Sequence, residues 1–168
     1  MALKAVFLDR DGVINIDKGY VYKKKDFIFA PDVFETLRYL QSRHYLLFII
    51  TNQSGIARGY YTEGDFLKLT KYMMHEFAKR DIKITKLYYC PHTPEENCQC
   101  RKPNPKMLLD AQKEFDIDMN ASWLIGDKQS DIEAGFNAGI KNTVYLGEGE
   151  TTAAYKIKSL KEAISLIP

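Results

Sequence analysis

The sequence predicts a single α/β domain built on a mostly parallel sheet. Short apolar runs alternate with longer amphipathic stretches along the chain, as in repeated βαβ units. The chain has 168 residues, of which 45% are hydrophobic and 27% charged, which is enough for one globular core. No Gly/Ser linker or internal repeat divides it. We therefore expect residues 1–168 to form one domain with helices on both faces of the sheet.

The expected elements follow the period of the apolar residues, which is short in strands and helical in the longer stretches. The predicted strands are Ala5–Leu8, Leu46–Thr51, Lys86–Cys90, Ser122–Ile125 and Thr143–Leu146. The predicted helices are Asp32–Arg43, Glu63–Lys79, Pro105–Phe115, Ser130–Ala138 and Leu160–Ile167.

Residues typical of helix ends support these boundaries. Thr62 and Asp65 have the spacing of a capping box. Asn104 before Pro105 suits a cap followed by proline in the first turn. Gly139 suits a left-handed helix stop.

Three connections are too long for simple turns, namely 12–29, 53–62 and 91–103. Each follows the carboxyl end of a predicted strand, where open α/β sheets bind ligands. No inserted domain is large enough to act as a lid, so these connections must cover any site themselves. That favours a small substrate.

Charge and composition narrow the class of protein. The formal net charge of +2 gives no electrostatic case for nucleic acid. No apolar run reaches the length of a membrane span, and the N-terminus enters the first strand almost at once. We expect a cytoplasmic monomer with neither a nucleic acid nor a membrane as partner.

Two acids, Asp9 and Asp11, directly follow the first predicted strand. Close carboxylates repel each other, so a cation must neutralise one or one must hold a proton. In an extended segment the Arg10 side chain should point away from both acids.

Polar residues at three other places complete a candidate site. Taken singly, each of these residues has an ordinary explanation. Thr51 and Asn52 could begin a turn, Lys102 could be a solvated surface residue, and Asp131 could stabilise a helix start. With Asp127, which also follows a strand, they combine carboxylates, a hydroxyl and a cation. Such an oxygen-rich site suits Mg²⁺ shared with a substrate phosphate.

With these residues the chain resembles the haloacid dehalogenase superfamily of phosphatases. The motifs Asp9-x-Asp11, Thr51, Lys102 and Gly126-Asp127-x-x-x-Asp131 occur in the superfamily's order. The resemblance implies a Rossmann-like, doubly wound parallel sheet of strand order 3-2-1-4-5 and hydrolysis of a phosphomonoester.

The resemblance also implies roles. Asp9 would attack phosphorus and become an aspartyl-phosphate, and Asp11 would protonate the leaving oxygen and then deprotonate water. Mg²⁺ would be held by Asp9, Asp127 and the backbone carbonyl of Asp11, with Asp131 in its outer shell. Two further residues, Thr51 and Lys102, would bind the phosphoryl oxygens.

The third long connection contains all three cysteines of the chain and one histidine. Its pattern is Cys-x-His, five residues, then Cys-x-Cys, formed by Cys90, His92, Cys98 and Cys100. An odd number of thiols cannot pair completely, and three thiolates with one imidazole make a closed tetrahedral Zn²⁺ set. We prefer structural zinc to buried thiols beside a surface histidine. The metal would stiffen the loop that carries Arg101 and Lys102.

This loop makes the chain similar to two phosphatase families, for heptose 1,7-bisphosphate and for histidinol phosphate. Both carry Cys-x-His and Cys-x-Cys ahead of Arg-Lys-Pro, and the segments 9–15 and 51–59 look closer to the heptose family. That resemblance implies removal of the C7 phosphate of D-glycero-D-manno-heptose 1,7-bisphosphate, which leaves heptose 1-phosphate for nucleotide-activated heptose, a lipopolysaccharide precursor. The gap within the Cys/His loop is shorter than in some relatives, which leaves the anomer open.

Other residues of the same connections are candidates to bind the sugar bisphosphate. Arg58 and Arg101 would meet the phosphate that is not cleaved, because a guanidinium grips phosphate bidentately. Lys128 is either a phosphate contact or a partner of the acids. Three more residues would either bind sugar hydroxyls or close turns, namely Asn15, Asn52 and Gln53.

Two alternatives remain open at this stage. Histidinol phosphate, with one phosphate, would need fewer cations than a bisphosphate. A non-enzymatic, receiver-like module phosphorylated on Asp9 would share the acidic pocket, but Asp11 as a general acid/base would make its phosphoryl group short-lived.

Overall fold

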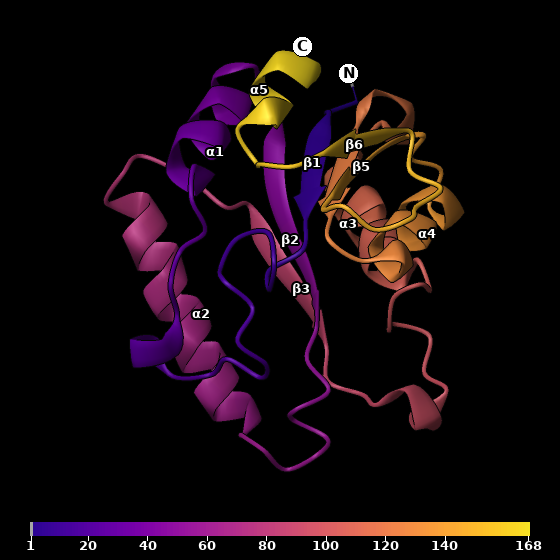
Figure 1. Cartoon of the computed structure of the whole chain (residues 1–168). Helices are drawn as coiled ribbons and strands as arrows, with labels where there is room; N and C mark the ends of the chain where they lie inside the picture. The colour runs from indigo at the N-terminus through magenta and orange to yellow at the C-terminus, as the bar shows by residue number, and fades with distance from the viewer. Residues whose placement is uncertain (1) are drawn as a thin grey trace.

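The computed structural model describes residues 2–168 and contains one six-stranded parallel sheet of order β3-β2-β1-β4-β5-β6 (Figure 1). Its strands are β1 (Ala5–Leu8), β2 (Leu46–Asn52), β3 (Lys86–Cys90), β4 (Trp123–Gly126), β5 (Asn142–Leu146) and β6 (Tyr155–Ile157). Its helices are α1 (Val33–Ser42), α2 (Glu63–Ala78), α3 (Lys106–Phe115), α4 (Gln129–Asn137) and α5 (Glu162–Leu166). The predicted class, order and helices are confirmed.

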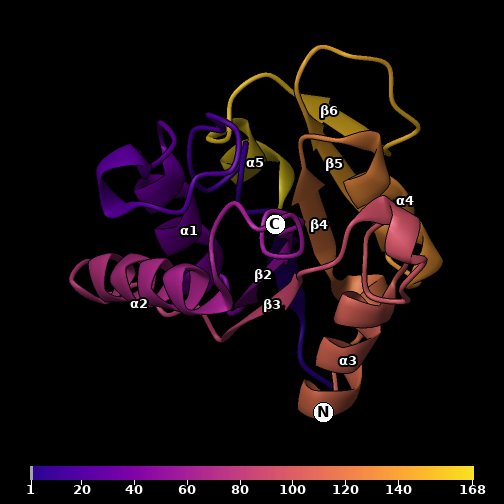
Figure 2. The ribbon, with the colours of Figure 1, turned by 90° about the horizontal axis from the view of Figure 1, so that it is seen from below.

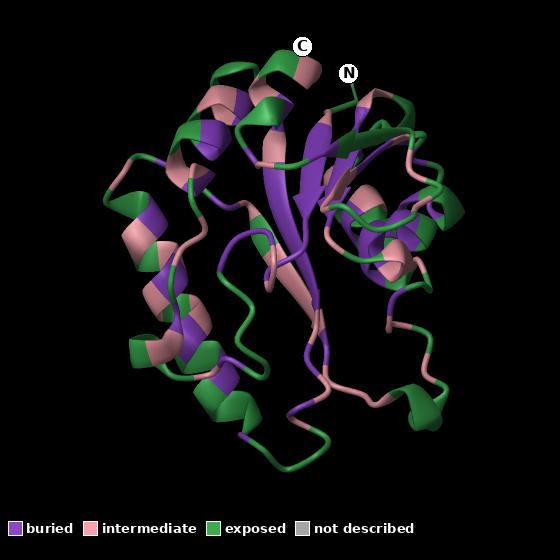
Figure 3. Cartoon of the chain, in the orientation of Figure 1, coloured by how far each residue is buried: buried purple, intermediate pink, exposed green. Residues whose placement is uncertain are grey.

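Alternate residues of the strands face two separate cores. Val6 and Leu8 of β1 belong to the core covered by α1, α2 and α5, whereas Ala5 and Phe7 belong to the core covered by α3 and α4. Figure 2 shows these helices on opposite sides of the sheet. Because both faces are covered, the central strands are buried throughout, as the purple strands in Figure 3 show.

Two details of the elements differ from the sequence expectation. The strand β6 was missed because it is short, and only one of its three residues, Ile157, is buried. Asn104 does not cap α3: Pro105 occupies the cap position, and the Asn104 amide instead donates to the carbonyl of Cys98 at 3.0 Å.

Other end signals are confirmed. Thr62 and Asp65 form a reciprocal capping box with both bonds at 3.0 Å, and Gly139 after α4 has a φ of +91°. No helix among residues 2–168 has the length and apolar character needed to cross a bilayer.

The three long connections gather at the carboxyl ends of the strands, at the lower rim in Figure 1. This follows from the parallel sheet, in which every strand ends at the same edge. The rim receives the end of β1 between those of β2 and β4. Residues from distant parts of the chain therefore meet around Asp9.

Candidate active site

Three carboxylates meet beyond the ends of β1 and β4. Asp9 continues β1, since its N–H donates to the carbonyl of Ile125 at 3.2 Å. Asp127 directly follows β4, and Asp131 lies in the first turn of α4. Each places a carboxylate oxygen within 4.8 Å of the others. Asp9 and Asp131 are buried. The predicted gathering of these acids is present.

Lys102 is buried among these acids. Its ammonium lies 2.8 Å from Asp9 Oδ1 and 2.6 Å from Asp131 Oδ1, and it donates to the carbonyl of Ile50 at 3.0 Å. Burial alone would lower the pKa of Lys102, but the charges of Asp131 and Asp9 outweigh burial and raise it. Lys102 is therefore cationic, and its burial at the site excludes the ordinary explanation of a solvated surface lysine.

If all three acids were ionised, they would carry more negative charge than Lys102 can balance. Burial, reinforced by the neighbouring Asp131, raises the pKa of Asp9 well above its usual range, although Lys102 opposes this. Burial also raises the pKa of Asp127. A divalent cation would favour the ionised form of both groups.

The residues present fit a Mg²⁺ ion. Asp127 Oδ1 is buried without a hydrogen-bond partner in the described chain. Gly12, at φ +94°, leaves the room that Asp127 occupies, because a Cβ there would overlap the carboxylate. Asp9 and Asp127 therefore present hard oxygen ligands close together, which is the chemistry that Mg²⁺ prefers.

Asp11 is held by three donors. Arg10 Nη2 and Asn15 Nδ2 donate to its Oδ1 at 2.8 and 3.0 Å, and Gln53 Nε2 donates to its Oδ2 at 3.3 Å. The expectation that Arg10 points away from the acids is wrong. The chain turns directly after Asp9, and the buried guanidinium reaches back to Asp11 and to the Val21 carbonyl at 2.8 Å.

The polar residues after β2 connect the loops of the site. Asn52 accepts from the N–H of Lys102 at 3.1 Å and donates to the carbonyl of Lys102 at 3.4 Å, which fixes the lysine's backbone. Thr51 is buried, and its hydroxyl oxygen accepts from Gln53 Nε2 at 2.9 Å. Asn15 is also fully buried and contacts Asp11 rather than solvent.

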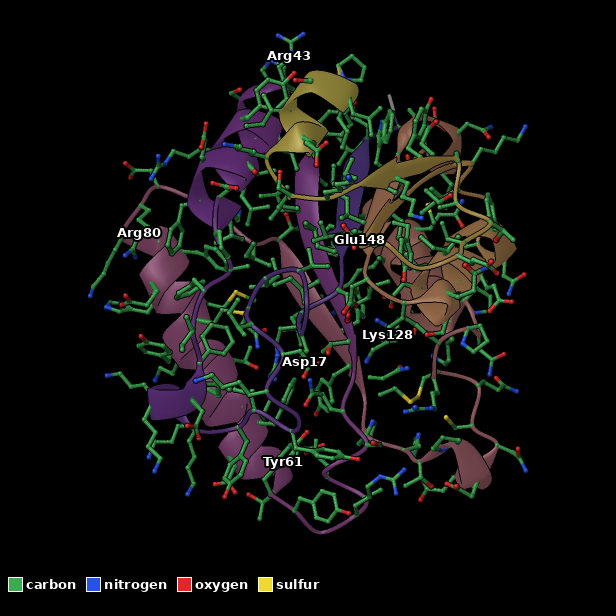
Figure 4. All side chains as sticks on the ribbon, in the orientation of Figure 1. Asp17, Arg43, Tyr61, Arg80, Lys128 and Glu148 are labelled. Atoms are coloured by element: carbon green, nitrogen blue, oxygen red, sulfur yellow. A yellow bond between two sulfur atoms is a disulfide. The ribbon has the colours of Figure 1, made fainter. Side chains whose placement is uncertain are left out.

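A cleft of about 340 Å³ opens beside these acids. Asp11, Asn52 and Gln53 line it, together with three of the predicted phosphate-binding cations, Arg58, Arg101 and Lys128. Figure 4 shows Asp17, Tyr61 and Lys128 around this rim, whereas Arg43 lies at the opposite end of the molecule. Lys128 makes no ion pair within residues 2–168, although its charge acts on Asp127, whose pKa it lowers.

The four predicted zinc ligands also meet. Cys98 Sγ lies 3.4 Å from Cys90 Sγ and 3.8 Å from Cys100 Sγ, and His92 Nδ1 lies 3.4 and 3.3 Å from Cys90 and Cys100 Sγ. The structure joins Cys90 to Cys100 in a disulfide, so the expectation of three free thiols is wrong for these two. The predicted clustering is confirmed.

Sequence reasoning missed two residues that contact the site's polar groups. Alternation of side chains places Arg10 away from the acids only if the strand continues through it. Strand β1 ends at Leu8, before Arg10. Tyr61, whose hydroxyl donates to Gln53 Oε1, was not singled out. Its position within the long connection 53–62 is the one available signal, and the sequence contains 11 tyrosines.

Comparisons with known proteins agree with this geometry. A family model described as HAD-hydrolase-like matches residues 99–163. The D-glycero-α-D-manno-heptose-1,7-bisphosphate 7-phosphatase of Campylobacter jejuni is 56% identical over 167 residues, covering 98% of this chain and 96% of that protein. The D-glycero-β-D-manno-heptose-1,7-bisphosphate 7-phosphatase of Helicobacter pylori is 49% identical over 168 residues, covering 98% and 97%.

A solved structure agrees as well. The D,D-heptose 1,7-bisphosphate phosphatase from B. bronchiseptica, complexed with magnesium and phosphate, has a TM-score of 0.88 and 26% identity, covering 98% of this chain and 97% of that one. A parallel sheet with carboxylates at β1 and β4 and a buried lysine between them is the arrangement of haloacid dehalogenase-like hydrolases. At these identities over nearly full length, the chain belongs to that superfamily and, within it, to the family of heptose 1,7-bisphosphate 7-phosphatases.

The buried ion pairs predict the effect of removing Lys102. Lys102→Met leaves Asp9 and Asp131 uncompensated, so in metal-free buffer the free energy of unfolding should fall by about 3–5 kcal/mol at neutral pH. The raised pKa of Asp9 favours the folded state as protons bind, so the deficit should shrink as the pH is lowered toward that pKa. Urea denaturation at several pH values measures both effects.

The matched control is Lys106→Met, because Lys106 pairs with Asp110 on the surface of α3. An exposed pair of this kind contributes little, so the control should remain within about 1 kcal/mol of the parent. A deficit for Lys102→Met that is equally small, or that grows on acidification, would contradict the account.

Proposed function

We propose that this chain is a Mg²⁺-dependent phosphatase that removes the C7 phosphate of D-glycero-D-manno-heptose 1,7-bisphosphate through an aspartyl-phosphate on Asp9. The observation that carries this proposal is the meeting of Asp9, Asp127 and Lys102 at the end of β1, beside a cleft lined by cations. The names of the full-length relatives support the substrate.

In this proposal Asp9 is the nucleophile. Held between Asp9, Asp127 and the Asp11 carbonyl, Mg²⁺ would offset the repulsion between the attacking carboxylate and the phosphate. Lys102 lies 2.8 Å from Asp9 Oδ1, so it can stabilise a phosphoryl group bonded at that carboxylate. The Thr51 hydroxyl donates to a phosphoryl oxygen. Asp131 holds Lys102 and supports the site without contacting phosphorus.

Asp11 transfers the protons. It protonates the departing sugar oxygen when Asp9 attacks, and it then takes a proton from the water that hydrolyses the aspartyl-phosphate. Its three donors Arg10, Asn15 and Gln53 keep its carboxyl group at the cleft. This second step argues against a signalling module, which must keep its phosphoryl group.

The cations of the cleft account for a bisphosphate. Lys102 is fully engaged with the acids, whereas Arg58, Arg101 and Lys128 line the open cleft. A second phosphate group would pair with these cations, and a guanidinium binds phosphate bidentately. Histidinol phosphate offers no second phosphate, so the bisphosphate fits the cleft better.

We further propose that the Cys/His cluster holds structural Zn²⁺ when its thiols are reduced, as we expect in the cytoplasm. A tetrahedral ion with Zn–S bonds of about 2.3 Å places its sulfur ligands about 3.8 Å apart. The spacings of Cys98 to Cys90 and to Cys100 are 3.4 and 3.8 Å. A disulfide accounts for the position of only two of these four residues, whereas a tetrahedral zinc site accounts for the convergence of all four.

The test of function is a phosphate-release screen over both heptose 1,7-bisphosphate anomers, other sugar bisphosphates and histidinol phosphate. Heptose bisphosphate should give the highest kcat/KM, with phosphate released from C7, and a chelator of Mg²⁺ should stop turnover reversibly. Asp9→Asn serves as the blank and should lose essentially all activity. Faster turnover of histidinol phosphate, or an active Asp9→Asn enzyme, would refute the proposal.

A second prediction concerns the uncleaved phosphate. Arg101→Ala and Arg58→Ala should each lower kcat/KM for the bisphosphate by about tenfold or more, since each loses a charged hydrogen bond. Turnover of p-nitrophenyl phosphate, which has one phosphate, should change little. Exposed Arg43, at the far end of the molecule, provides the control Arg43→Ala. Equal losses on both substrates would argue against a second phosphate site.

A third prediction separates zinc from a disulfide. Cys98→Ser should abolish zinc binding by the reduced protein and lower its thermal stability. The reason is that Cys98 is a ligand in the proposed zinc site, whereas it is a free thiol beside the Cys90–Cys100 disulfide. Metal analysis and thermal unfolding, with and without reductant, measure this. A variant as stable as the parent, or a zinc-free parent with full stability and activity, would show that the cluster holds no structural zinc.

A further inference from the structure

Gln53 uses both of its amide hydrogens inside the protein. The side chain is 3% exposed. Its Nε2 donates to Asp11 Oδ2 at 3.3 Å and to Thr51 Oγ1 at 2.9 Å, and its Oε1 accepts from the hydroxyl of Tyr61. A primary amide has two hydrogens, so neither remains for a sugar hydroxyl. Gln53 therefore has no hydrogen left to donate to substrate, and its donor contacts act on Asp11 and Thr51.

The neighbours of Gln53 decide which way its amide faces. In the hydrolysis step, where the proposed mechanism has Asp11 ionised, its carboxylate can only accept, so the amide nitrogen faces it and the amide oxygen faces Tyr61. In the flipped orientation two oxygens would oppose each other at Asp11. Burial raises the pKa of Tyr61 to about 12, so its hydroxyl keeps the proton that this orientation requires.

The ring of Tyr61 is fixed independently of its hydroxyl. It is 5% exposed, and it stacks on Tyr22 with ring centroids 5.1 Å apart and planes 14° apart. Gly55 lies against it, because a Cβ there would overlap the ring. Removing the hydroxyl alone should therefore leave the ring in place and break one hydrogen bond.

The chain of donors continues into the site. Because Thr51 Oγ1 accepts from Gln53, its own hydrogen must point elsewhere, and within the described residues it has one contact, to the Asn52 carbonyl at 3.5 Å. So long a contact is weak, which leaves the hydroxyl hydrogen available to a phosphoryl oxygen.

We propose that Tyr61 is a positioning residue that acts through Gln53, aligning Asp11 for proton transfer and Thr51 for donation to the phosphoryl group. This inference rests on the proposed phosphatase function. Neither Tyr61 nor Gln53 touches the reacting atoms, so the predicted effect lies in kcat rather than in KM.

The test is a double-mutant cycle of Tyr61→Phe and Gln53→Met, measured as kcat and KM on heptose 1,7-bisphosphate. In the parent, Tyr61→Phe should lower kcat about three- to tenfold, the equivalent of one neutral hydrogen bond, with KM changed less than about twofold. In the Gln53→Met background the same substitution should change kcat by less than about 1.5-fold, because the amide through which it acts is gone.

Tyr22→Phe is the matched control. It removes a hydroxyl from the stacked partner, and that hydroxyl has no hydrogen bond within residues 2–168, so kcat should stay at the parent value. An unchanged kcat in Tyr61→Phe, or an equal loss in both backgrounds, would overturn the inference. A parent without activity on any phosphate ester would instead refute the proposed function.

A second measurement serves if Gln53→Met does not fold. The side-chain amide hydrogens of Gln53 should exchange slowly with solvent in the parent and markedly faster in Tyr61→Phe, as followed by nuclear magnetic resonance. Equal exchange rates in the two proteins would show that Tyr61 does not hold the amide, and the inference would fail.

Discussion

The site depends on one buried cation held between two buried anions. Lys102 lies 2.8 Å from Asp9 and 2.6 Å from Asp131, and all three side chains are shielded from water. Burying an isolated charge is costly, so none of the three would be stable there alone. The geometry of this triad thus requires β1, α4 and the loop before α3 to be in place together.

The loop that carries Lys102 is held at two points. Asn52, at the end of β2, makes a pair of hydrogen bonds with the backbone of Lys102, and the Cys/His cluster lies just before it in the chain. These contacts fix the position of a segment without regular structure at the point where it carries the charge of Lys102. Arg101, the next residue back, lines the cleft while its Nη1 donates to the His92 carbonyl at 3.3 Å.

Two glycines make room for the acids. A Cβ on Gly126 would overlap the carboxyl group of Asp131, and a Cβ on Gly12 would overlap that of Asp127. Each acid can thus approach the backbone more closely than a residue with a Cβ at the glycine position would permit. Asp9, the proposed nucleophile, directly follows strand β1, whereas the predicted substrate contacts lie on loops. This division suits a site that holds phosphorus firmly and adapts to the rest of a small molecule.

The amino-acid sequence was sufficient to predict strands β1 to β5, the helices and the meeting of Asp9, Asp127 and Lys102, because apolar periodicity sets the strands and parallel strands end at one edge. It also determined that the cysteines and His92 would cluster, since they are close in the chain. The tertiary structure alone decided where Arg10 points, that Asn15 and Gln53 face Asp11, and that Tyr61 completes their network. Those contacts join residues from different loops, and loop paths depend on packing that no local pattern records.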